Sequence, residues 1–107
     1  MKDSKAAKAF QRKLLIAWCI GQQATNLTGL QKITGMPRRT LQDCIKDLDD
    51  VGIICQFHQQ DDARNNQGEY RIESWGPIEP NWVNNQIGAI AKSLNINLLP
   101  LDDLPTP

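Results

Sequence analysis

The stretch from Leu30 to Ile54, LQKITGMPRRTLQDCIKDLDDVGII, predicts two helices joined by a tight turn and followed by a β-strand. Gly35 stands where the first helix must end, because helices commonly stop on a glycine in the left-handed conformation. Pro37 fits just ahead of the next helix, where its missing N–H costs nothing. Gly52 supplies the same kind of stop again. These signals predict a helix over 38–51 and a strand directly after it.

The predicted helix over 38–51 is amphipathic. Its apolar residues recur at helical spacing and share one face, namely Leu41, Cys44, Ile45 and Leu48. The opposite face is polar and contains Arg38, Arg39, Gln42, Asp43 and Lys46. Two arginines at the beginning of a helix are well placed to contact a phosphate backbone or a guanine edge.

The chain before this stretch predicts one long helix and one short helix. Apolar residues at helical spacing predict a helix from Ser4, its N-cap, to Ile20, with Gly21 as its stop. Residues 22–27 form a connector that can pair briefly as a short strand. Thr28, with a glutamine three residues later, has the pattern of a capping box and predicts the start of the second helix.

The chain after the central stretch predicts a β-hairpin. Residues 53–59 (IICQFHQ) and 69–75 (EYRIESW) are rich in strand formers, and a polar, turn-forming loop over 60–68 (QDDARNNQG) separates them. Alternation in the first strand predicts one face with Ile53, Cys55 and Phe57.

A last helix is predicted to begin at Pro80. Its apolar residues repeat at spacings of four, three and four and form a narrow seam, which consists of Val83, Ile87, Ile90 and Leu94. Such a seam is typical of helices that pair side by side. The sequence leaves open whether it packs onto the first helix of the same chain or forms a homodimer contact. The following residues 97–107, with three prolines and two aspartates, predict an irregular tail.

Length and composition predict one ordinary globular domain, over 1–96. The chain has 107 residues, 40% of them hydrophobic and 22% charged, and no apolar run reaches the roughly 20 residues that span a bilayer. The three cysteines are widely spaced among aliphatic residues, a pattern of neither a disulfide framework nor a zinc site. We therefore expect reduced thiols and a cytoplasmic location. One histidine and the lack of a phosphate-binding glycine loop or metal-ligand spacing predict a protein that is no enzyme and needs no cofactor or metal.

Charge is unevenly distributed along the chain although the formal net charge is zero. Residues 1–46 contain nine lysines and arginines against two acids, whereas residues 47–107 contain three against ten. If the basic half forms one face, it steers the protein toward an anionic polymer, and the acidic half is left for a partner protein. If the two halves interleave in space, this asymmetry disappears.

The order helix, helix, helix, strand, strand, helix resembles the winged helix-turn-helix family of DNA-binding proteins, and the chain looks like its small single-domain prokaryotic members. Two segments carry the resemblance, LQKITGMPRRTL (30–41) at the turn and LDDVGII (48–54) at the entry to the wing. It implies a mainly α fold with a β-hairpin, in which a three-helix core is followed by a two-stranded wing and an additional C-terminal helix. It extends over about Phe10 to Trp75.

The resemblance also implies which residues would contact DNA. In this family the third helix lies in the major groove, which assigns base and phosphate contacts to Arg38, Arg39, Thr40, Gln42, Asp43 and Lys46. Lys32 on the second helix is a candidate phosphate clamp. In the wing, Arg64, Asn65 and Asn66 can donate to phosphates, although Asp61 and Asp62 make the base of this wing less basic than DNA contact favours.

Two features of the third helix stay open at this stage. Asp43 lies four residues after Arg39, so it either orients that guanidinium or accepts a hydrogen bond from cytosine. The pairs Arg39–Asp43 and Lys46–Asp50 also fit ordinary ion pairs on a solvated helix, each worth about 0.2–0.5 kcal/mol.

These observations predict a sequence-specific double-stranded DNA-binding protein that regulates transcription as a homodimer through its third helix and wing. The alternative is a winged-helix protein-interaction module that does not itself bind DNA. Neutral net charge, the acidic wing base and the proline-rich tail favour that alternative.

Overall fold

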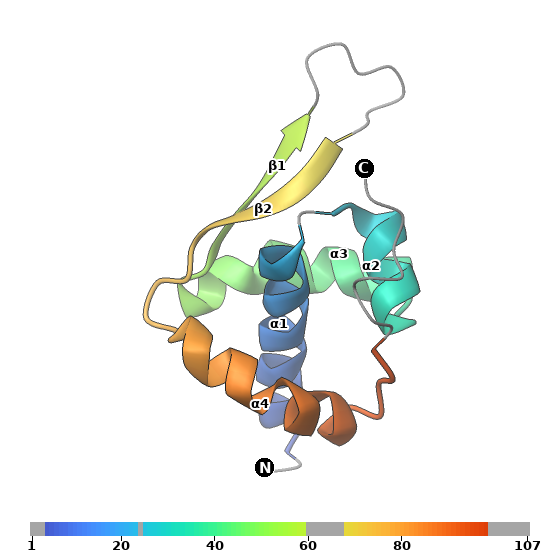
Figure 1. The fold of residues 1–107 in the computed structure, drawn as a ribbon, viewed down its shortest axis with the longest axis vertical. Helices are drawn as coiled ribbons and strands as arrows, with labels where there is room; N and C mark the ends of the chain where they lie inside the picture. Colours follow the sequence, from blue (N-terminus) through green and yellow to red (C-terminus); the bar gives the residue numbers. More distant parts are fainter. Residues whose placement is uncertain (1–3, 24, 60–67, 99–107) are drawn as a thin grey trace.

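The computed structural model describes residues 4–23, 25–59 and 68–98, and it contains four α-helices, a short 3₁₀ helix and an antiparallel pair of strands within these residues. This arrangement confirms the predicted mainly α fold with a β-hairpin. Helix α1 stands upright in the middle of the molecule, α4 crosses its lower part, and the hairpin extends from the opposite end (Figure 1). No helix in the described part of the chain combines the length and the hydrophobicity that crossing a membrane requires.

Helix α1 (Lys5–Gln22) is the centre of the core. Ser4 caps it as predicted, since the Ser4 side chain accepts a hydrogen bond from the Ala7 backbone N–H. The residues from Leu14 to Ala17 are all buried and cover a full turn of the helix, so α1 is enclosed on every side there. It contacts α2, α3, α4 and β2.

Two predicted helix boundaries are wrong. Helix α1 continues through Gly21 to Gln22, and a Cβ built on Gly21 would make only an ordinary van der Waals contact with the Trp75 ring, at 3.4 Å. Helix α2 (Leu27–Thr34) is capped by Asn26 and not by Thr28, since the Asn26 side chain accepts from the Gly29 N–H at 2.9 Å. Asparagine is as good an N-cap as threonine or better, and it stands two residues earlier.

Helix α3 (Arg38–Lys46) is shorter than predicted. The chain tightens into the 3₁₀ helix η1 (Asp47–Val51) before it stops at Gly52, whose φ of 86° confirms the predicted left-handed end. Through η1, Leu48 is buried in a small second cluster with Ala17 and Ile53. The last residues of the predicted helix therefore form η1, which connects the core to the sheet.

Strands β1 (Ile54–Gln59) and β2 (Gly68–Ser74) pair antiparallel, as predicted, although β1 begins one residue later. The predicted inward face of β1 is wrong in part, because Phe57 is 45% exposed while Cys55 is half-buried. A register shift between Ile54 and Cys55 changes the direction of the strand as it leaves the core.

The predicted connector strand before α2 is confirmed as a single bridge. The Tyr70 N–H of β2 donates to the Thr25 carbonyl oxygen at 2.7 Å. This bond attaches the hairpin to the segment that leads into α2. The position of the wing relative to the first three helices is thus held by backbone as well as by side chains.

Helix α4 (Pro80–Ser93) packs onto α1 within the same chain. Val83 and Ile90 are fully buried, and Ile87 and Leu94 are half-buried against the same core. Of the two alternatives for this seam, the structure shows the first, in which the seam packs onto α1 of the same chain. The residues predicted for dimerisation, Val83, Ile87, Ile90 and Leu94, are therefore not a free surface, because they already cover α1.

We expect the buried thiol of Cys19 to make the free energy of unfolding fall at alkaline pH. Burial raises the pKa of Cys19 from 9.0 to about 12, so the folded state holds this proton more tightly than the unfolded state does. The resulting stability is fully present below pH 9 and is lost as pH rises toward about 12. Urea unfolding across this range measures the loss. Cys19→Ala lowers stability at every pH but flattens the dependence, and an unchanged slope in that variant contradicts the assignment.

Candidate nucleic-acid interface

The turn between α2 and α3 is held by one buried threonine. The Thr34 hydroxyl donates to the Leu30 carbonyl at 2.7 Å and accepts from the Met36 backbone N–H at 3.1 Å. Gly35 between them adopts φ 71°, as its position in the sequence predicts. Met36 is itself buried. These contacts fix the angle at which the chain enters α3.

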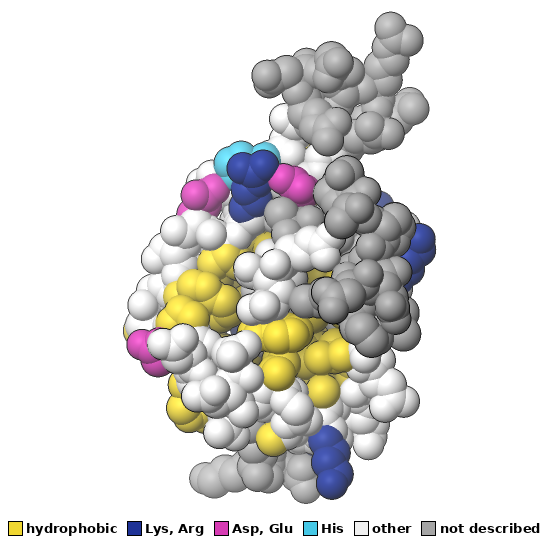
Figure 2. Space-filling model, viewed as in Figure 1, with side chains coloured by type: hydrophobic (Ala, Val, Ile, Leu, Met, Phe, Trp, Pro, Cys, Tyr) yellow, Lys and Arg dark blue, Asp and Glu magenta, His cyan; other side chains and the backbone are white. Residues whose placement is uncertain are grey.

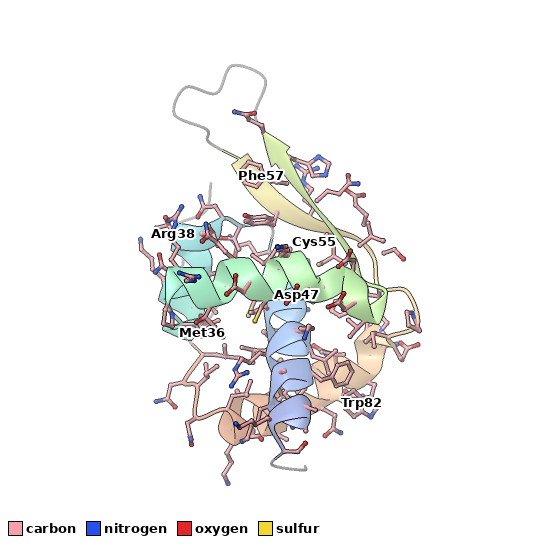
Figure 3. All side chains as sticks on the ribbon, turned by 180° about the vertical axis from the view of Figure 1, so that it is seen from behind. Met36, Arg38, Asp47, Cys55, Phe57 and Trp82 are labelled. Carbon is pink, nitrogen blue, oxygen red and sulfur yellow. The ribbon has the colours of Figure 1, made fainter. Side chains whose placement is uncertain are left out.

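Helix α3 is anchored by its apolar face and leaves its polar face free. Leu41 is fully buried, and Cys44 and Ile45 are half-buried against the core. The predicted contact residues on the other face are exposed except for Thr40, which is half-buried; the exposed ones are Arg38, Arg39, Gln42, Asp43 and Lys46. Seen from behind, α3 lies across the molecule with Arg38 at one end and Asp47 toward the other (Figure 3).

Most charges at the two ends of α3 oppose its helix dipole, whereas Lys46 in the last turn favours it. Arg38 and Arg39 occupy the positive N-terminal end. This end has no side-chain cap, because Pro37 precedes it, and its first turn contains no acidic residue. Asp47, Asp49 and Asp50 follow the negative C-terminal end, within η1. Each such charge is unfavourable by about 0.3–1 kcal/mol at an exposed site. An anion placed against the N-terminal end would reverse that cost, because it would meet free N–H groups and two guanidinium groups together.

Of the two roles left open for Asp43, the tether to Arg39 is not formed in this structure. Within the described residues, neither Arg39–Asp43 nor Lys46–Asp50 forms a salt bridge. The side chains of Arg38 and Arg39 are therefore free to turn toward a ligand. Asp43 stays a candidate contact residue on the same exposed face.

The wing contributes an aromatic pair that the sequence analysis missed. Phe57 and Tyr70 face each other across the two strands with ring centroids 5.0 Å apart in an edge-to-face arrangement. Gly68 makes room for the Phe57 ring, because a Cβ there would come within 2.7 Å of it. The sequence analysis placed Phe57 on the inward face by alternation. The pair with Tyr70 could have been predicted only if the register between the two strands had been known.

Tyr70 lies close enough to Arg38 for the positive charge of Arg38 to affect the pKa of Tyr70. Burial raises the pKa of Tyr70, the nearby Cys55 raises it further, and the positive charge of Arg38 lowers it. The aromatic pair therefore borders the N-terminal end of α3, and Figure 3 shows Phe57 on the hairpin above that helix. Lys32, the predicted phosphate clamp on α2, is exposed. Arg64, Asn65 and Asn66, with Asp61 and Asp62, lie outside the described residues.

The outer face of the hairpin carries one ion pair, Arg71 with Glu69, and a close contact between His58 and Glu73. His58 Nε2 lies 2.6 Å from a Glu73 carboxylate oxygen, and Arg71 lies 2.6 Å from that of Glu69. Figure 2 shows the face turned away from α3, where hydrophobic and uncharged side chains occupy the middle and charged ones gather over the strands. The side of the molecule that carries α3 is therefore the better candidate for an anionic partner.

Comparisons with known proteins agree with this geometry. A family model described as a winged helix-turn helix matches residues 5–94. The crystal structure of a DUF2131 family protein from Shewanella amazonensis superposes with a TM-score of 0.82 and 44% sequence identity, covering 88% of this chain and 90% of that one. No curated protein matches the sequence.

We expect Thr34→Val to lower the free energy of unfolding by about 1–3 kcal/mol, because it removes both hydrogen bonds of the hydroxyl and leaves the Met36 N–H buried without a partner. Thr34→Ser keeps the hydroxyl and is the matched control. Chemical denaturation measures both variants. A valine variant as stable as the serine variant would show that the turn does not depend on this oxygen.

Proposed function

We propose, from the premise that this chain belongs to the winged helix-turn-helix family, that it binds double-stranded DNA sequence-specifically and regulates transcription. A winged-helix domain by itself suggests DNA binding in general. The observation that carries the finer proposal is the N-terminal half of α3, which is rigidly held from behind and exposes Arg38, Arg39 and Gln42 together.

These three side chains suit base reading in a major groove. An arginine can donate two hydrogen bonds to a guanine, and a glutamine can pair with the donor and acceptor of an adenine. Leu41 holds the helix from the core side, so the exposed side chains project from a fixed support. Positioning contacts to phosphates would come from Lys32 on α2, Lys46 on α3 and the residues of the wing.

We also propose that the protein acts as a homodimer on a short palindrome. A domain of this size contacts few phosphates, and two recognition helices one turn of duplex apart are the usual remedy. Because the seam of α4 covers α1, the dimer needs another surface. The outer side of α4 supports this role, since Trp82 is 49% exposed and Asn85 and Ala89 lie exposed on the same helical stripe.

The base-reading role predicts that Arg38→Ala and Arg39→Ala each weaken binding to the preferred duplex by about 1–3 kcal/mol. The preferred duplex is first selected from a random library and sequenced. Binding by the unaltered protein should fall steeply with salt, because phosphate contacts release counterions.

Lys5→Ala, at the exposed start of α1, is the charge-matched control. It should leave duplex affinity unchanged. Undetectable or salt-independent binding across the duplex pool would refute DNA binding. Equal losses for all three variants would refute the assignment to α3.

The dimer surface predicts that Trp82→Arg shifts the protein from dimer to monomer in sedimentation velocity. Gln56→Arg places the same charge on an exposed residue of β1, off α4, and is the control. A protein that is monomeric without any substitution, both free and on the selected duplex, would contradict the homodimer.

A second candidate function is a protein-interaction module, favoured by the acidic residues Asp47, Asp49 and Asp50 directly beside α3. They repel phosphates near the C-terminal end of that helix and would attract a basic protein surface. This function is favoured over the first if the isolated chain binds no duplex while it co-purifies with a protein in fixed stoichiometry.

A further inference from the structure

A cavity of about 510 Å³ lies beside the turn of the helix-turn-helix, apart from the exposed face of α3. Its walls are the first half of α1, the turn over 34–37 with Thr40, and residues 93–96 at the end of α4. Met36, labelled in Figure 3, belongs to the wall nearest α3. The cavity therefore lies between α1, the end of α4 and the start of α3.

One wall is built by a partly buried polar network. The Lys8 ammonium group donates to the Ser93 carbonyl oxygen and, at 3.2 Å, to the Ser93 hydroxyl oxygen. That hydroxyl in turn donates to the Gln11 side-chain oxygen at 2.8 Å, and Gln11 is only 5% exposed. This network ties α1 to the end of α4. It also holds the charge of Lys8 at the edge of the cavity.

Arg12 supplies the second positive charge. Its side chain lines the cavity and is half-buried. The described part of the chain gives it no carboxylate partner, and none of the described residues that line the cavity is acidic. A partly desolvated cation is costly unless a counter-charge meets it. Thr40 adds a hydroxyl donor on the opposite wall.

We propose that this cavity binds an oxyanion, a phosphate or carboxylate group, with the Arg12 guanidinium as its main partner. Arginine matches such groups because its planar fork can donate two parallel hydrogen bonds. Lys8 adds charge from the side, and the Thr40 hydroxyl adds a third donor. The oxyanion comes either from a free small molecule or from a phosphate of the DNA backbone, and the second source rests on the proposed function.

Inorganic phosphate is the probe for the site. It is titrated into ¹⁵N-labelled protein at constant ionic strength, with sodium chloride as the balancing salt. We expect saturable shifts in the amide signals of Gly35, Met36, Thr40 and Asn95, which surround the cavity. Arg12→Gln should weaken the binding by about tenfold, the loss of one charge-assisted hydrogen-bonding partner.

Lys13→Gln removes the same charge from the next residue of α1, which does not line the cavity, and is the matched control. The amide spectrum of each variant without phosphate shows that it is folded. Shifts that do not saturate, or that are the same in the Arg12→Gln and Lys13→Gln variants, would overturn the proposal.

Duplex binding by the same variants identifies the source of the oxyanion. If a backbone phosphate enters the cavity, Arg12→Gln lowers the slope of log affinity against log salt by about one. If a free molecule enters it, Arg12→Gln leaves this slope unchanged. Failure of the protein to bind any duplex would refute the proposed function alone, because the phosphate titration contains no DNA.

Discussion

The enclosure of α1 is the constraint on which the rest of the structure depends. Leu14, Leu15, Ile16 and Ala17 are buried at consecutive positions, so this helix has no solvent side in its middle and every other element is placed against it. Full burial of a leucine or isoleucine side chain stabilises by roughly 1.5–3 kcal/mol. The contacts with α2, α3, α4 and β2 therefore form one cooperative core, and the orientation of α3 is a consequence of it.

That rigid support explains how α3 can carry charges that do not favour the helix itself. Arg38 and Arg39 at its N-terminal end and the aspartates of η1 after its C-terminal end all oppose the dipole. Leu41 and the turn held by Thr34 compensate from the core side. Unfavourable local charge on a well-anchored helix is typical of a surface kept for a ligand.

The helix-turn-helix was predictable because its signals are local. Gly35 and Gly52 end helices through their own backbone freedom, and Leu41 repeats with Cys44 and Leu48 whatever the rest of the chain does. Predictions that required a choice between similar local signals were less successful. Asn26 and Thr28 are both good caps, and the bridge from Thr25 to Tyr70 holds the chain directly before Asn26, where α2 begins. Phe57 was placed inward by alternation, although the bend after Ile54 carries the strand out of the core.

The sequence alone determined the order of the elements, the family, and the exposed basic start of α3, because periodicity, glycine stops and arginine positions are properties of short segments. The tertiary structure decided what those segments meet. It placed the α4 seam on α1 instead of on a second subunit, left Arg39 without Asp43, and brought Lys8 and Arg12 to the end of α4 beside the turn. Contacts between residues more than 80 positions apart, such as Lys8 with Ser93, depend on how the helices pack, and no local pattern in either segment encodes that packing.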